Sequence, residues 1–180
     1  MKILLIMFLS INIFASVKQD ILNLYQNQKY ESACNIGFSN FRNHNRDEEF
    51  LSLYAFSCLK ADYIDRLALP IAKLKFSAES RANSAYFSII LMQKKLLYHA
   101  LVDDYELSEL NLPTTDYILS KVFEFYVNLG KHDRRTLYIF DDPDNKKVSY
   151  KLYLQKDYKT SKMVIEEYYD TMLVKRHIYW

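Results

Sequence analysis

The chain has 180 residues, of which half are hydrophobic and 16% are aromatic, and its formal net charge is +2 at pH 7. A charge this close to zero argues against a nucleic-acid-binding protein, which needs a strong basic excess. Only two glycines are present, Gly37 and Gly130, which excludes glycine-rich phosphate loops and favours long helices over a fold rich in tight turns.

The first fifteen residues have the three-part layout of a secretory signal peptide. Lys2 supplies a positive start, an apolar run covers 3–14, and Ala15 is a small residue suited to cleavage. The run is shorter than the ~20 residues that span a bilayer as a helix, and no cysteine follows it to accept a lipid. We therefore predict a periplasmic mature chain that begins at Ser16, carries a net charge of +1 after the loss of Lys2, and has no membrane span.

Apolar residues recur at steps of three and four from Asp20 to Gly130, which predicts five or six helices. Pro70 is expected to break or kink the irregular helix that contains it, or to start a new segment. Gly130 is expected to cap the last helix. The expected helical segments are a short one from Asp20, then 30–41, 50–61, 62–74, 80–101 and one that opens at 113–116.

The segment 80–101 is expected to form one long helix with a single apolar side. That side is assigned to Ala85, Ile89, Met92, Leu96 and Leu97, and the other sides to Arg81, Lys94 and Lys95.

Two segments can be aligned with each other, YESACNIGFSNF at 30–41 and YIDRLALPIAKLKF at 63–76. In both, a tyrosine and an acidic residue precede an alanine, and the two alanines, Ala33 and Ala68, are 35 positions apart. The pattern and the spacing resemble the tetratricopeptide repeat, whose period is 34 residues.

This resemblance covers roughly residues 18–76. The usual Trp-Leu-Gly signature is missing, because Leu53 and Tyr54 stand where Leu-Gly is expected. The resemblance implies an α-hairpin array with a concave face for a peptide or a partner domain, and a generic α-hairpin array is the alternative. As a whole the chain is also similar to small exported proteins of low-GC Gram-negative bacteria, a likeness that implies no activity.

The period of the pattern changes after Gly130 from that of a helix to that of a strand. Residues 136–140 are β-branched and aromatic, a turn follows at 141–145, and apolar residues then alternate with polar ones over 148–155. Residues 161–180 are again β-rich and contain one or two strands, the last of them an edge strand docked on the helices.

We therefore predict an α+β fold that is mostly α. An α-hairpin array occupies 16–130, and a small antiparallel β-sheet of three or four strands occupies 131–180 and packs on the helices. A sheet this small needs such support, and Ile118, Val122 and Phe125 on the preceding helix are the nearest candidates in sequence.

Cys34 and Cys58 are the only cysteines in the chain. The predicted helices place them on neighbouring elements, and an oxidising periplasm permits pairing. We therefore predict a disulfide, with two buried free thiols as the alternative. The chain has no CxxC motif, so neither a thioredoxin-type redox centre nor a common zinc site is indicated.

Other polar residues give no catalytic, cofactor-binding or metal-ligating assignment. Glu166 and Glu167 are neighbours on a strand and are expected to point to opposite faces. The acidic turn around Asp142 lacks the glycine and the closing glutamate of a calcium loop, and no GxSxG motif is present. The four histidines lack metal-ligand spacing and are interpreted as surface or half-buried residues: His44, His99, His132 and His177. The calcium candidates interpreted as an ordinary turn are Asp141, Asp142, Asp144 and Asn145.

The sequence therefore predicts a periplasmic module for protein–protein interaction or scaffolding, with no cofactor and no evident catalytic activity. Its expected partner is a protein or a peptide and not a nucleic acid. The alternatives are a structural subunit of an envelope complex and an enzyme whose site is assembled from scattered residues.

Overall fold

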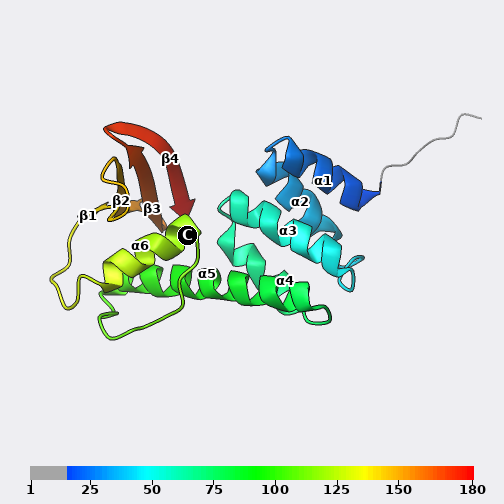
Figure 1. Ribbon diagram of the computed structural model, residues 1–180, viewed down its shortest axis with the longest axis horizontal. Helices are drawn as coiled ribbons and strands as arrows, with labels where there is room; N and C mark the ends of the chain where they lie inside the picture. Colours follow the sequence, from blue (N-terminus) through cyan, green and yellow to red (C-terminus); the bar gives the residue numbers. More distant parts are fainter. Residues whose placement is uncertain (1–15) are drawn as a thin grey trace, which may run out of the picture.

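The computed structural model describes residues 16–180, in which a series of helices is followed by an antiparallel sheet (Figure 1). The helices are α1 (Val17–Gln26), α2 (Tyr30–Asn40), α3 (Glu48–Lys60), the short 3-10 helix η1 (Ile64–Leu67), α4 (Ala68–Ile71), α5 (Ala78–Asp103) and α6 (Ile118–Val127). The strands are β1 (Leu137–Asp141), β2 (Val148–Lys156), β3 (Ser161–Tyr169) and β4 (Met172–Tyr179), in the order β1-β2-β3-β4. All neighbouring strands are antiparallel. The predicted α+β fold, mostly α, is confirmed.

The predicted signal peptide and its cleavage after Ala15 concern residues that lie outside this description. Within residues 16–180, no helix is long and apolar enough to cross a membrane.

Three helices begin directly after N-cap residues whose positions the apolar periodicity does not predict. Ser16, Asp47 and Ser77 each accept a hydrogen bond from the main-chain N–H three residues later. Such caps satisfy donors that a helix start leaves unpaired. As a result α1 begins at Val17, earlier than the predicted Asp20, and α5 begins at Ala78.

The predicted helix over 62–74 is replaced by two short ones, η1 and α4. Asp62 has a positive φ of 64° directly after α3, which redirects the chain. Pro70 then lies in the first turn of α4, where its missing N–H leaves no hydrogen bond unmade.

The predicted helix opening at 113–116 is wrong, because α6 begins only at Ile118. Two side chains hold the preceding segment in a non-helical conformation. The Pro113 carbonyl accepts from the buried amide of Gln93 at 3.0 Å, and the Thr115 N–H donates to the Ser120 hydroxyl at 2.7 Å.

Helix α5 runs along the base of the molecule beneath both the other helices and the sheet (Figure 1). It packs against α3, α4, η1, α6, β2 and β3, so its buried surface is wider than one stripe. The predicted apolar side is therefore partly wrong, since Ala85 and Met92 are exposed. The buried apolar residues of α5 are instead Phe87, Ile90, Leu97, Ala100 and Leu101.

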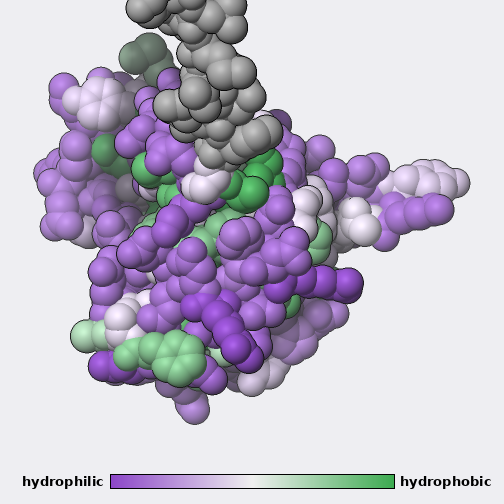
Figure 2. Space-filling view, turned by 90° about the vertical axis from the view of Figure 1, so that its right-hand side faces the viewer, coloured by the Kyte–Doolittle hydropathy of each residue, from purple (hydrophilic) through white to green (hydrophobic). Residues whose placement is uncertain are grey.

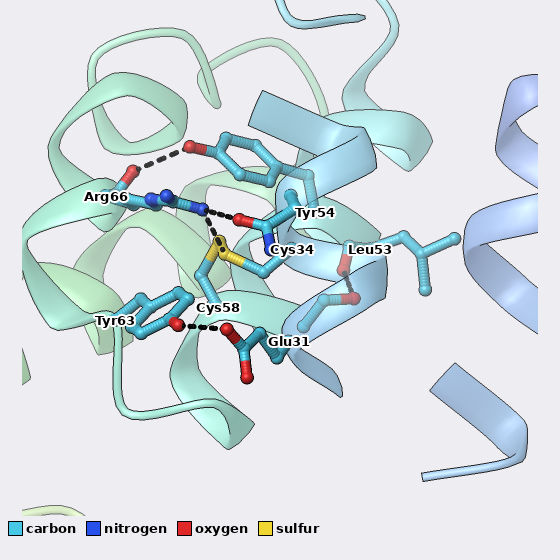
Figure 3. The surroundings of a disulfide bond; sticks show 9 residues. Glu31, Cys34, Leu53, Tyr54, Cys58, Tyr63 and Arg66 are labelled. Carbon is cyan, nitrogen blue, oxygen red and sulfur yellow. Dashed lines mark hydrogen bonds between the residues drawn. A yellow bond between two sulfur atoms is a disulfide. The ribbon is translucent and has the colours of Figure 1, made fainter. Parts of the chain in front are cut away.

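The structure joins Cys34 of α2 to Cys58 of α3 in a disulfide, with the Cα atoms 4.7 Å apart (Figure 3). Gly37 lets the same two helices approach, because a Cβ at this position would lie 2.5 Å from the Tyr54 ring. A side chain at position 37 would therefore displace Tyr54, which is fully buried. Glycine and tyrosine together set the close packing here, in place of the Leu-Gly pair absent from α3.

The sheet lies against the helices through one face, as predicted. Val122 of α6 is fully buried, and the Phe125 ring lies 5.8 Å from Phe140 and 5.9 Å from Tyr150. One cluster of buried residues extends from Ile21 in α1 to Tyr179 in β4. Helices and sheet thus share a core.

Asp142, in the predicted acidic turn, ties the sheet to α6. Its buried carboxylate accepts from the Lys121 ammonium at 2.7 Å, the Tyr150 hydroxyl at 2.9 Å and the Asp144 N–H at 3.0 Å. The hydrogen bond from Lys121 is the main cause that lowers the pKa of Asp142 to about 2. The turn therefore has a structural link as well as the expected local hydrogen bonding.

We predict that Asp142→Asn destabilises the protein at neutral pH by about 1–3 kcal/mol, since a charge-assisted bond is lost. Because the folded-state pKa of Asp142 is lowered, its contribution is complete above the ordinary pKa of 3.8 and is lost as the pH falls toward about 2. The free energy of unfolding, measured by urea titration, should therefore differ most between wild type and variant above pH 5.

Asp144→Asn is the matched control, because only the main chain of Asp144 takes part in these contacts. Equal stability of the two variants at pH 6, or a difference between Asp142→Asn and wild type that persists unchanged to pH 2, would contradict this role.

Candidate functional site

A pocket of about 290 Å³ lies where the η1 segment meets the end of β4, and we call it the junction pocket. Helix α5 contributes Lys94 to its lining. Its lining residues are Asp62, Tyr63, Ile64, Asp65, Arg66, Lys94, Ile178, Tyr179 and Trp180.

The η1 side of the junction pocket is held by Arg66, which reaches back to α2 (Figure 3). Its guanidinium donates to the Asn35 side chain at 2.7 Å and to the Cys34 sulfur at 3.4 Å. The same group lies over the rings of Phe38 and Tyr63, 4.8 Å and 4.7 Å from their centroids. The disulfide-linked helices therefore determine where this wall of the pocket stands.

The β4 side is held by a buried polar network around Asp62. The carboxylate accepts from His177 Nδ1 at 2.8 Å and from the Tyr117 hydroxyl at 2.7 Å. Tyr117 and Tyr179 bring their hydroxyls to 3.3 Å from each other. Burial raises the pKa of both tyrosines well above 10, so both stay neutral at physiological pH.

His177 is buried, which corrects the interpretation of this residue as surface or half-buried. Its Nε2 atom has no hydrogen-bond partner within residues 16–180 and no contact with solvent. An imidazole in this position orients β4 through Asp62 and does not face the junction pocket. Sequence reasoning missed the pair because Asp62 and His177 are 115 positions apart.

The burial of Lys94 also corrects a prediction. The sequence pattern assigns this residue away from the buried side of its helix, but it is only 2% exposed. Its ammonium lies 3.1 and 3.0 Å from the two carboxylate oxygens of Asp65 and 2.6 Å from the main-chain oxygen of Trp180. Lys95, on the exposed side, also contacts Asp65 at 2.9 Å. Burial lowers the pKa of Lys94, against the opposing effect of Asp65.

The charged groups of the junction pocket are thus largely satisfied by the protein itself. Asp62 pairs with His177, Asp65 with the two lysines, and Arg66 with α2. The parts of the wall that remain for a ligand are the rings of Tyr63 and Trp180 and the side chain of Ile178. This arrangement suits an apolar or aromatic side chain.

The remaining candidates from the sequence do not converge on the junction pocket. His44 stacks on Phe50, His99 bonds to Asp103, and His132 bonds to the Gly130 carbonyl. The register places Glu166 opposite Arg176 and Glu167 opposite Lys175, on the two faces of the sheet as predicted. Over the described range 16–180, no three His, Cys, Asp or Glu residues gather in a way that could hold a metal ion.

Strand β4 and the residue that follows it expose apolar side chains on both faces of the sheet, and we call this set of residues the β4 strip. It consists of Met172, Leu173, Val174, Ile178 and Trp180, which are 68, 52, 59, 37 and 60% exposed. β4 is an edge strand, paired on one side only within the described chain. By contrast, Figure 2 looks onto the helical end of the molecule and shows a largely hydrophilic surface with separate hydrophobic patches.

Comparison with protein-family models, with curated proteins and with solved structures finds no match to this chain. The function must therefore be inferred from the geometry described above.

We predict that Lys94→Met lowers the free energy of unfolding by about 1–3 kcal/mol, because Asp65 and the Trp180 carbonyl lose a buried donor. Trp180 is the only tryptophan, so a shift of the fluorescence emission should accompany this loss. Lys95→Met is the control, since it removes a neighbouring contact to the same carboxylate at an exposed position, with an expected cost within about 0.5 kcal/mol. Equal effects of the two substitutions on stability and emission would show that Lys94 does not anchor β4.

Proposed function

We propose that this protein is an exported interaction module that binds an extended segment of a partner protein along β4, with one side chain of that segment in the junction pocket. The observation that carries the proposal is the β4 strip, which exposes four apolar side chains on an edge strand and a fifth directly after it, next to a pocket with apolar and aromatic walls. Apolar residues clustered in this way mark interaction sites more often than singly scattered ones do.

An edge strand offers unpaired main-chain groups to an added strand. In recognition by strand addition, main-chain hydrogen bonds supply affinity and pockets for alternate side chains supply specificity. β4 has an edge without a neighbouring strand, and Ile178 of β4 and the adjoining Trp180 line the junction pocket at its end. Both elements of this recognition mode are therefore adjacent.

The charges of β4 favour a different protein over a second copy of this chain. Lys175 and Arg176 lie side by side in the strand, which contains no acidic residue. Antiparallel pairing of two β4 strands around their centre would bring these cations against each other, and like charges directly opposite are destabilising. The segment that fits best has an acidic residue opposite Lys175, between apolar residues, because Arg176 already pairs with Glu166 at 3.1 Å.

The test is to place a photo-crosslinking amino acid at Leu173 in the producing cell and to identify the crosslinked protein. The purified partner should then bind wild type, and Met172→Asp/Val174→Asp should weaken binding at least tenfold, about 1.4 kcal/mol. Leu69→Asp/Phe76→Asp is the control, because it places the same charges at exposed apolar residues of the helical part. Equal loss of binding in both double variants, or none in either, would contradict the proposal.

Export is supported by the disulfide, which is typical of oxidising compartments, together with the signal-like pattern of residues 1–15. We expect the intact mass of the periplasmic protein to match a chain that begins at Ser16 or within a few residues of it. The mass should be about 2 Da below that of the reduced chain, because disulfide formation removes two thiol hydrogens. A full-length cytoplasmic chain with two free thiols would contradict export.

Scaffolding within an envelope complex is a narrower form of the same role. Co-purification of one partner in a fixed stoichiometric ratio would distinguish such a permanent subunit from a module that binds its partner reversibly.

A further inference from the structure

A second pocket, of about 310 Å³, lies at the opposite side of the sheet from β4 and differs from the junction pocket in its charge. It is formed where the end of α5, the connection before β1 and the second half of β2 meet, and we call it the basic pocket. Its lining residues are Leu101, Arg134, Arg135, Thr136, Tyr153, Leu154 and Lys156. Its volume is at the lower end of the range of small-molecule sites, about 300–1,000 Å³.

The basic pocket is lined by three cations and by no carboxylate. Arg134, Arg135 and Lys156 take part in none of the ion pairs formed within residues 16–180. Other prominent cations of the chain are neutralised, as Lys94 is by Asp65 and Lys121 by Asp142. A concave surface with one sign of charge concentrates its field on the space that it encloses.

Both arginines are exposed, and the fold holds the side chain of Arg134 and the main chain of Arg135 while guanidinium donors remain free. Arg134 uses one terminal nitrogen to donate to the Leu101 carbonyl at 2.9 Å, which leaves further N–H groups of its guanidinium available. The Arg135 main-chain N–H donates to the Tyr138 hydroxyl at 3.1 Å, and its guanidinium lies 5.9 Å from the centre of the same ring. Planar guanidinium groups placed in this way suit the paired oxygens of a carboxylate or a phosphate.

The rest of the wall is apolar. Leu101 is buried and Leu154 is half-buried. The Tyr153 hydroxyl donates to Glu166 at 3.0 Å and accepts from Arg176, so this residue offers the pocket its ring and no free polar group. A small inorganic anion would satisfy the cations but leave this apolar surface uncovered.

We infer that the basic pocket binds an anionic amphiphile, whose carboxylate or phosphate head group contacts Arg134, Arg135 and Lys156 while a short apolar chain covers Leu101, Leu154 and the Tyr153 ring. The basic pocket and the junction pocket share no lining residue, and the one contact between the basic pocket and β4 is that of Tyr153 with Arg176.

The test is calorimetric titration of the folded protein with decanoate and with decyl phosphate, each below its critical micelle concentration. The two probes distinguish a carboxylate head group from a phosphate one, and saturable one-to-one binding of either supports the inference. Inorganic phosphate supplies the head group without the chain, and decyltrimethylammonium supplies the chain with the opposite charge. Both should bind at least about tenfold more weakly.

The variant Arg134→Gln/Arg135→Gln should weaken binding of the amphiphile at least about tenfold. Lys60→Gln/Lys146→Gln is the control, because it lowers the net charge equally at two exposed positions outside the pocket, and its dissociation constant should stay within about twofold of wild type. Lys156→Gln, at an exposed position of β2, is a second variant that tests the site if the double variant does not fold. We expect it to weaken binding about threefold.

Three results would overturn the inference. The first is the absence of one-to-one binding by either anionic amphiphile. The second is equal affinity in the folded pocket variants and in the control. The third is binding of phosphate alone, or of the cationic amphiphile, as tight as that of the anionic ones.

Discussion

The buried ammonium of Lys94 is the point on which the arrangement of the molecule depends. It joins three parts of the chain, since α5 carries it, η1 supplies Asp65, and the main-chain oxygen that it binds belongs to Trp180, directly after β4. A buried charge needs partners, because its desolvation is costly unless hydrogen bonds replace the lost water. The need to satisfy one ammonium therefore draws a helix, a turn and a strand together, and the junction pocket is the space left between them.

A second constraint acts from the other side of the same turn. The disulfide and the close contact of Gly37 with Tyr54 bind α2 to α3, and Arg66 extends this unit to η1. The turn that begins at Asp62 is thus held by α2 in one direction and by His177 and Lys94 in the other. Since both walls are rigidly supported, the pocket is preorganised, and a ligand would spend little free energy on ordering it.

Much of the fold could be predicted from local patterns, because periodicity, turn residues and cysteine positions are local properties. The helices, the alternating strand that became β2 and the pairing of Cys34 with Cys58 are of this kind. The roles of Lys94 and His177 could not be predicted in this way. Each depends on partners far away in sequence. Helical periodicity can place Lys94 beside the buried face of α5, but it does not show which groups the ammonium will contact. The start of α6 was missed for a similar reason, since Gln93 and Ser120 hold Pro113 and Thr115 outside the helix.

The link between Asp62 and His177 also affects the order in which the parts of the molecule fold. The two residues are 115 positions apart, and contacts of such long range form late because the closure of a large loop must precede them. The helices α1 to α3, whose contacts are local and whose disulfide closes a short loop, can form before the rest of the chain is present. The junction pocket cannot, because its second wall is the last strand. A chain whose N-terminal end emerges first therefore forms its helical part first and its binding site last. A truncated or incompletely emerged molecule thus lacks the junction pocket.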